Sequence, residues 1–193
     1  MGIISNTNTP NYTIAIWKIT ETLEELLQLS HAISTADFNT EKRKKEWLVS
    51  RLLLNEINPN CSISYNPFGA PELNNGSFIS ISHSKGLVAI IISQQQVGLD
   101  IEEISEKTLR VSSKFILKNN LEDLTAEKAT LIWCCKEAIY KWHQKGEVDF
   151  IADIKLHPFE NMEKGEISAK FRDTQLILHY QKIHNHYLVY VCK

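Results

Sequence analysis

Two carboxylates that lie close together in the sequence are the first residues that could do chemistry. Asp100 and Glu102 are two residues apart in the segment GLDIE at 98–102, which has the apolar pattern of a strand. Because side chains alternate along a strand, both carboxylates face the same side. Such a pair repels, and a hard cation such as Mg²⁺, which prefers oxygen ligands, would relieve the repulsion. The alternative is an exposed strand end with two solvated acids, because acids at this spacing are common.

A third carboxylate and a lysine lie further along the chain. Glu137 and Lys141 are four residues apart in the segment WCCKEAIYK at 133–141, inside an expected helix. One interpretation of this spacing is an ordinary helical ion pair. The functional one is that Glu137 completes a metal site or acts as a base, while Lys141 neutralises a phosphate. The large side chains of Trp133 and Tyr140 lie with Glu137 opposite the apolar stripe, which predicts a second packing contact or a pocket wall there.

Positive charge is concentrated at the start of another expected helix, in the run EKRKK at 41–45. Cations at a helix N-terminus oppose the helix dipole. The run is therefore either merely solvated or the receptor of an anion, and the residues alone leave both interpretations open.

Polar side chains also end an expected strand, in the segment SISHS at 80–84. The Ser82 hydroxyl and the His83 imidazole could donate hydrogen bonds to phosphate oxygens. The alternative is an ordinary turn after the strand. A nucleophilic serine is not indicated, because no acid stands at a recognisable spacing from His83.

Strands and helices follow one another in blocks around these residues. Expected strands cover 12–19, 61–65, 78–82, 88–93, 97–101, 151–157, 166–172, 175–181 and 186–192. Expected helices are a short one with a capping box of Thr22 and Glu25, one over 40–57, and a helical stretch over 112–146 that is capped by Thr125 and ended by Gly146. The close spacing of the strands between 61 and 101 suggests an antiparallel meander. This order predicts an α+β fold of two similar modules, 1–95 and 96–193, each an antiparallel sheet packed with helices.

Composition limits the classes of partner. The 193 residues include 21 Lys and Arg against 23 Asp and Glu, which gives a formal net charge of −2 and no bulk attraction to nucleic acid or to an anionic membrane. No apolar run approaches the roughly 18 residues of a membrane span, and the start of the sequence lacks the pattern of a signal peptide. The four cysteines lack C-x-x-C spacing, so a structural zinc site is not expected. We expect them to pack as small hydrophobic side chains in a reducing cytosol and not to form disulfides. We expect a cytoplasmic monomer that binds neither nucleic acid nor membrane.

The motifs in combination resemble a known family. They are TEKRKKEWLVSR at 40–51, FGAPEL at 68–73, SISHS at 80–84, GLDIE at 98–102 and WCCKEAIYK at 133–141. In kind and order these are similar to the motifs of the 4'-phosphopantetheinyl transferases, specifically the larger surfactin-synthetase-activating type, which is a pseudodimer in one chain. The last two motifs, about thirty residues apart, are the most specific.

The resemblance implies a reaction and a role for each motif. Such enzymes transfer the 4'-phosphopantetheine group of coenzyme A to a serine of an apo acyl or peptidyl carrier protein and release adenosine 3',5'-bisphosphate. The metal ligands would be Asp100, Glu102 and Glu137, holding Mg²⁺ or Mn²⁺. Glu137 would also be the base, Lys141 would stabilise phosphate charge and Lys136 would assist. The 3'-phosphate and adenine end of coenzyme A would meet Lys42, Arg43, Lys45 (or Lys44 in its place) and Arg51, and the pyrophosphate would meet Ser82 and His83.

One departure from the family keeps a second hypothesis open. The family often has Gly-Lys-Pro where this chain has Gly69, Ala70 and Pro71, so one cation is missing. Ala70 therefore favours a non-catalytic member of the same fold that only binds coenzyme A or a carrier protein. A different Mg²⁺-dependent nucleotide enzyme is a third hypothesis, but the sequence has neither a P-loop nor a G-x-G-x-x-G segment.

Overall fold

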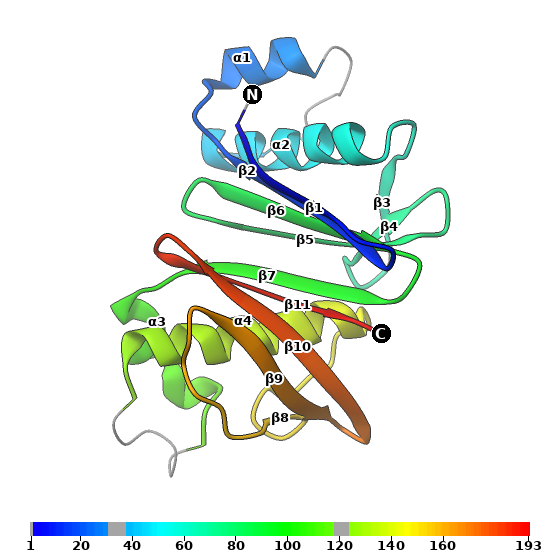
Figure 1. The fold of residues 1–193 in the computed structure, drawn as a ribbon. Coiled ribbons are helices and arrows are strands. Elements are labelled where there is room, and N and C mark those ends of the chain that lie inside the picture. The colour runs from blue at the N-terminus through cyan, green and yellow to red at the C-terminus, as the bar shows by residue number, and fades with distance from the viewer. Residues whose placement is uncertain (1, 31–37, 118–123) are drawn as a thin grey trace.

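Two antiparallel sheets meet between two layers of helices (Figure 1). The computed structural model describes residues 2–30, 38–117 and 124–193. Helices α1 (Leu23–Leu29) and α2 (Glu41–Ile57) cover the outer side of the first sheet, and α4 (Ala126–His143) covers that of the second. Helix α3 (Glu106–Arg110) packs on α4 and is followed by a 3-10 turn, Ser112–Lys114. The expected α+β fold, with two antiparallel sheets each packed with helices, is confirmed.

The first sheet is built from the N-terminal half of the chain. Its strands are β1 (Ile3–Asn8), β2 (Tyr12–Lys18), β3 (Ile63–Tyr65), β4 (Pro71–Leu73), β5 (Phe78–Ser84) and β6 (Leu87–Ser93), in the order β1-β2-β6-β5-β4-β3. Every residue of β6 is buried. Because this strand is covered on both faces, its sequence LVAIIIS is a continuous apolar run rather than an alternating one.

The second sheet contains β7 (Val97–Glu103), β8 (Ile154–Leu156), β9 (Lys164–Phe171), β10 (Thr174–Ile183) and β11 (His186–Cys192), in the order β7-β11-β10-β9-β8. Along β9, buried residues alternate with exposed ones. This period of two indicates a strand with one face on the core and the other in solvent. The strand β7 lies at the edge of the sheet and, in the described part of the chain, pairs with β11 alone, so its other side is free to meet β5.

Three apolar clusters hold the layers together. One joins α2 to the first sheet and includes Leu48, Leu53 and Ile90, and another joins α4 to the second sheet and includes Cys135 and Val189. A third lies between the sheets and includes Ile16 and Ile91 of the first sheet with Leu99 and Leu188 of the second. Burial of apolar surface between the sheets therefore fixes where the edge strand β7 lies relative to β5.

Local signals at the helix starts were predicted correctly. The side chain of Thr40 accepts a hydrogen bond from the backbone N–H of Arg43, Thr125 does the same at the start of α4, and Thr22 and Glu25 form a complete capping box. Each of these caps satisfies backbone donors that the first turn of a helix leaves free.

Three sequence-based expectations are corrected. The strand expected at 97–101 does not continue the meander, since it leaves the first sheet and pairs with β11. The long helix ends at His143, because Gln144 adopts a left-handed conformation with φ of 60° two residues before Gly146. The helical stretch expected from residue 112 onward contains the 3-10 turn instead, and its residues 118–123 lie outside the described part of the chain.

Strands β1 and β4 were not predicted. The division into modules 1–95 and 96–193 stays a prediction.

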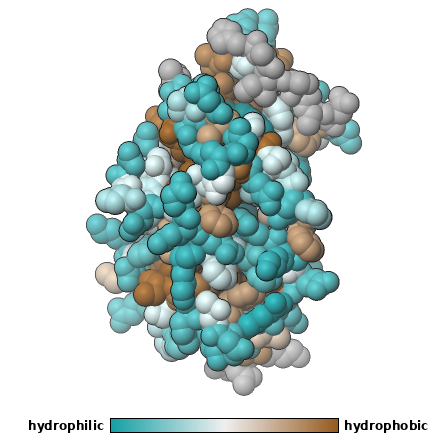
Figure 2. All heavy atoms as spheres, turned by 90° about the vertical axis from the view of Figure 1, so that its right-hand side faces the viewer, coloured by the Kyte–Doolittle hydropathy of each residue, from teal (hydrophilic) through white to brown (hydrophobic). Residues whose placement is uncertain are grey.

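The face of the molecule shown in Figure 2 is mainly hydrophilic. Hydrophobic side chains appear there in small separate groups among hydrophilic ones. Among the described residues, none of the helices combines the length and the apolar character that crossing a membrane requires.

Candidate active site

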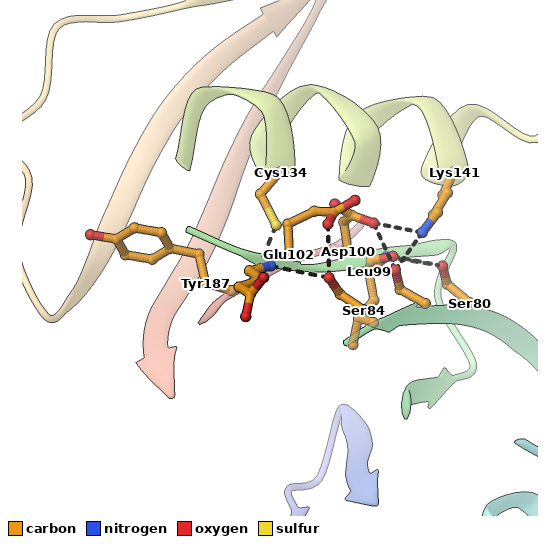
Figure 3. Close-up of polar contacts among 10 residues, drawn as sticks. Ser80, Ser84, Leu99, Asp100, Glu102, Cys134, Lys141 and Tyr187 are labelled. Atoms are coloured by element: carbon orange, nitrogen blue, oxygen red, sulfur yellow. Dashed lines mark hydrogen bonds and ion pairs between the residues drawn. The ribbon is translucent and has the colours of Figure 1, made fainter. Parts of the chain in front are cut away.

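A row of serines on β5 joins the two sheets (Figure 3). Ser82 donates a hydrogen bond to Oδ1 of Asp100 at 2.7 Å, and Ser84 donates one to Oε2 of Glu102 at 2.9 Å. Ser80 accepts one from the backbone N–H of Leu99 at 2.9 Å. Alternate residues of a strand share a face, so every second residue of β5 points at β7. The serines thereby hold both carboxylates of β7 on one side of that strand, as the sequence predicts.

Lys141 of α4 pairs with Asp100 and not with Glu137 four residues before it. Its Nζ lies 2.7 Å from Oδ1 of Asp100 and donates to the Ser82 hydroxyl at 2.8 Å. The Asp100 side chain is 4% exposed and that of Lys141 25%. The interpretation of Glu137 and Lys141 as an ordinary helical ion pair is therefore wrong for this structure, because β7 offers the ammonium a buried carboxylate instead.

The three carboxylates influence one another electrostatically. Burial, with the charges of Asp100 and Glu102, raises the pKa of Glu137 to about 7, although the ammonium of Lys141 acts in the opposite direction. Burial and the neighbouring Asp100 also raise the pKa of Glu102 above its ordinary value. Crowded carboxylates with raised pKa values are a common feature of functional sites, because a structural role rarely needs them.

The carboxylates of Asp100, Glu102 and Glu137 are suitable ligands for a hard dication, although their side chains do not converge on a single point. The buried Oδ2 of Asp100 has no hydrogen-bond partner within the described structure. With the nearby carboxylates of Glu102 and Glu137 it offers oxygen donors of the kind that Mg²⁺ prefers. Over the ranges 2–30, 38–117 and 124–193, no three acidic, histidine or cysteine side chains are arranged as a metal cluster. The side chains thus fit a metal by their chemistry and burial.

A cleft of about 560 Å³ opens beside this group, between α2, β5 and the end of α4. Its wall carries four groups that can be cationic: Arg43, Arg51, His83 and Lys141. Arg51 is held in place, because its guanidinium lies 4.1 Å from the ring centroid of Trp47 and donates to the Tyr65 hydroxyl at 2.9 Å. A rigid guanidinium loses little entropy when it binds a phosphate. The arrangement is able to bind a small polyanion.

Some residues that were predicted to bind coenzyme A lie elsewhere. Lys42 and Lys45 pair with glutamates of their own helix, Glu46 at 3.6 Å and Glu41 at 3.1 Å. Neither lysine is part of the cleft wall. Ser82 is also absent from the wall, because its hydroxyl is turned to Asp100 and Lys141.

Lys136 is not brought to the cleft. Its ammonium donates to the backbone carbonyl oxygens of Ile154, at 2.8 Å, and of Phe150. Burial, with a contribution from Lys155, lowers its pKa to about 8. On α4, Lys136 is one residue from Glu137 and therefore points about 100° away from it. The structure gives it the function of fastening the segment after α4.

Gly98 was not singled out from the sequence, although it controls how closely α4 approaches β7. A Cβ placed on Gly98 would lie 2.0 Å from the carbonyl oxygen of Ala138 and 2.5 Å from the backbone N of Trp142. A glycine inside a strand is the signal that could have indicated a close backbone approach. This contact brings α4 close enough for Lys141 to reach Asp100 and for the charges of Asp100 and Glu102 to act on Glu137.

Gly98→Ala is expected to lower the free energy of unfolding by about 3 kcal/mol, the upper part of the range for overpacking, because both clashing atoms are backbone. Denaturant unfolding measures the loss. Gly165→Ala in β9 is the matched control, since its Cβ would meet only the ring end of Tyr180, at 3.1 Å. Equal losses in the two variants would contradict the close approach of α4 and β7.

Comparison with known proteins agrees with this geometry. The family model described as "4'-phosphopantetheinyl transferase superfamily" matches residues 96–192, about half of the chain. The chain is also similar to the 4'-phosphopantetheinyl transferase gsp of Aneurinibacillus migulanus, with 30% identity over 111 residues that cover 52% of this chain and 47% of that protein. The match thus spans about half the length of this relative. The range matched by the family model includes the carboxylates and Lys141, whereas α2 lies outside it.

Proposed function

Since the chain belongs to the 4'-phosphopantetheinyl transferase superfamily, we propose that it transfers the 4'-phosphopantetheine group of coenzyme A to a serine of an apo acyl or peptidyl carrier protein. The observation that carries the proposal is that Lys141, which lines the cationic cleft, pairs with the buried Asp100, while Asp100 and Glu102 act electrostatically on Glu137 one turn earlier on the same helix. The protein would act as a monomer in the cytoplasm.

The cleft is the proposed site of coenzyme A. The ligand has three phosphate groups, and Arg43, Arg51, His83 and Lys141 in the wall give it charge-assisted partners. Aromatic side chains such as Tyr65 and Phe68, both exposed at the cleft, offer surfaces for the adenine base. Lys42 and Lys45, outside the wall, would add long-range attraction.

The chemical step is an attack by the carrier serine on the phosphorus nearer to pantetheine. A bond forms between the serine oxygen and this phosphorus, the bond to the adenosine-side phosphate breaks, and adenosine 3',5'-bisphosphate leaves. Glu137 accepts the serine proton. Lys141 stabilises negative charge on the phosphate oxygens.

Asp100, Glu102 and Glu137 are the residues proposed to hold Mg²⁺. What the ion supplies when bound is the screening of the negative charge of the pyrophosphate. The serines of β5 contribute by holding two of these carboxylates in place, through the hydrogen bonds of Ser82 and Ser84.

A direct test is incubation of the chain with coenzyme A, Mg²⁺ and a panel of apo carrier proteins. Mass spectrometry of the carrier is expected to show a gain of about 340 Da, the mass of the transferred phosphopantetheine group. Binding of coenzyme A without a mass shift on any carrier would favour the second hypothesis, a non-catalytic binding protein.

Ala70→Lys is expected to strengthen coenzyme A binding by about tenfold. Ala70 lines the cleft, where a lysine would restore one charge-assisted hydrogen bond, and such a bond contributes roughly 1.5–3 kcal/mol before its exposure to solvent is considered. Isothermal titration calorimetry measures the change, with Ala70→Gln as a control for added size. No gain would mean that Arg51 and its neighbours already satisfy the ligand at this position.

A further inference from the structure

A buried glutamate stands behind His83 in the wall of the cleft. Glu46 is 4% exposed, and its Oε2 lies 3.3 Å from Nδ1 of His83. Its Oε1 is buried and, among the described residues, accepts no hydrogen bond, although Nζ of Lys42 lies 3.6 Å from it. The imidazole itself is 41% exposed and lines the cleft. A carboxylate is costly to bury with an incomplete set of partners, so its place next to an exposed imidazole calls for an explanation.

The charges around His83 come from two helices. Burial lowers the pKa of His83 below its ordinary value of 6.5, and Lys141 of α4 and Arg43 and Lys42 of α2 lower it further. Glu46 is the group that acts in the opposite direction. The free imidazole is therefore largely neutral at pH 7, and only a second negative charge on its cleft side, together with Glu46, would make protonation favourable.

We propose that Glu46 is a positioning residue for ligand binding: it pairs with Nδ1 of His83, leaves Nε2 toward the cleft, and lets the imidazole take a proton from solvent when a phosphate group binds. The inference rests on the proposed function, because it assumes that coenzyme A occupies the cleft. Once protonated, His83 carries one N–H for Glu46 and one for a phosphate oxygen. His83 is thus largely neutral in the free protein and becomes a cationic partner of the ligand when the ligand binds.

The first test is the proton balance of coenzyme A binding to the full chain. Calorimetry in two buffers of different ionisation enthalpy is expected to show proton uptake between pH 6 and 8 for the wild-type chain. Glu46→Gln keeps the size of the side chain and removes its charge, so the uptake is expected to fall and the affinity at pH 7 to drop about tenfold, which corresponds to a one-unit decrease in the pKa of His83.

The opposite sign would overturn the proposal. If Glu46 merely repelled the anionic ligand, Glu46→Gln would increase the affinity for coenzyme A. A double-mutant cycle separates the two effects, since the loss caused by Glu46→Gln is expected to disappear when His83→Gln is already present. A loss of equal size in both backgrounds would show that Glu46 does not act through His83. Glu56→Gln is the matched control, because Glu56 is exposed nearly three turns further along α2.

A readout without ligand keeps this inference separate from the proposed function. An NMR titration of His83 in the free protein is expected to give a lower pKa in Glu46→Gln than in the wild-type chain, with no change in Glu56→Gln. Equal values in all three proteins would overturn the pairing. If the wild-type chain binds no coenzyme A, the proposed function fails, while this titration still decides whether Glu46 is the partner of His83.

Discussion

Glu137→Gln is expected to reduce phosphopantetheine transfer by about 10²–10⁴-fold, the usual contribution of a general base. The affinity for coenzyme A is expected to change by less than about threefold, because proton abstraction is an interaction of the transition state and not of the bound substrate. Single-turnover transfer to an apo carrier measures the first quantity and calorimetry the second. An affinity that falls as steeply as the rate would show that Glu137 chiefly holds a ligand.

The pH dependence of the wild-type rate follows from the same residue. Because burial, with Asp100 and Glu102, raises the pKa of Glu137 to about 7, the carboxylate is only partly ionised at neutral pH. A base acts in its ionised form, and bound Mg²⁺ lowers the pKa of a carboxylate that faces it, so the rate is expected to rise with pH through a midpoint at or below about 7 and to level off above it. This rise is expected to be missing from the residual activity of the glutamine variant.

Low activity of Glu137→Gln could also result from loss of folding. The structure predicts instead that this variant is no less stable than the wild-type chain. A carboxylate whose pKa is higher in the folded than in the unfolded state destabilises the folded protein at pH values above the folded pKa. Replacing Glu137 by a neutral side chain removes this cost. Glu137→Gln is therefore expected to be at least as stable as the wild-type chain at pH 8 in thermal unfolding, and a clear decrease would contradict the burial of an ionised Glu137.

Periodicity along the chain was enough to predict the elements that carry the carboxylates. Asp100 and Glu102 share a face because β7 has a period of two, and α2 and α4 begin at the threonines that cap them. The predicted packing contact of Trp133 is also confirmed, since its ring lies 5.0 Å from that of Phe115. The shared face of the carboxylates and the helix starts depend on neighbours within a few residues, which the sequence displays directly; for Trp133 the sequence predicts that its face is covered, but not that Phe115 covers it.

Contacts between distant segments could not be predicted in this way. The pairing of Lys141 with Asp100 depends on the close approach of α4 and β7, and the strand that pairs with β7 is β11, almost ninety residues later in the sequence. Lys136 is next to Glu137 in the sequence, yet its side chain reaches the carbonyl of Ile154. Lys136 and Glu137 point about 100° apart on the helix, and the segments packed around α4 decide which of them faces the carboxylates and which one binds the segment after the helix.

Lys141→Met is the second change with a large expected effect. The substitution keeps the length of the side chain and leaves the buried Asp100, 4% exposed, without its cation. Removal of one partner from a buried ion pair typically costs about 3–5 kcal/mol, and because Lys141 is itself 25% exposed we expect a decrease of about 3 kcal/mol in the free energy of unfolding. Denaturant unfolding at pH 7 measures it.

The charge of Asp100 should account for most of this loss. Asp100→Asn added to Lys141→Met removes the unpaired charge, so the double variant is expected to regain stability relative to Lys141→Met alone. Added Mg²⁺ is expected to raise the midpoint of thermal unfolding more in Lys141→Met than in the wild-type chain, since a cation bound near Asp100 would replace the missing one. Lys145→Met, at an exposed position four residues further on and beyond the end of α4, is the control. If Lys141→Met lowers the free energy of unfolding no more than this control does, the ion pair with Asp100 contributes nothing to stability. If Mg²⁺ raises the midpoint of thermal unfolding equally in all variants, the metal does not bind at Asp100.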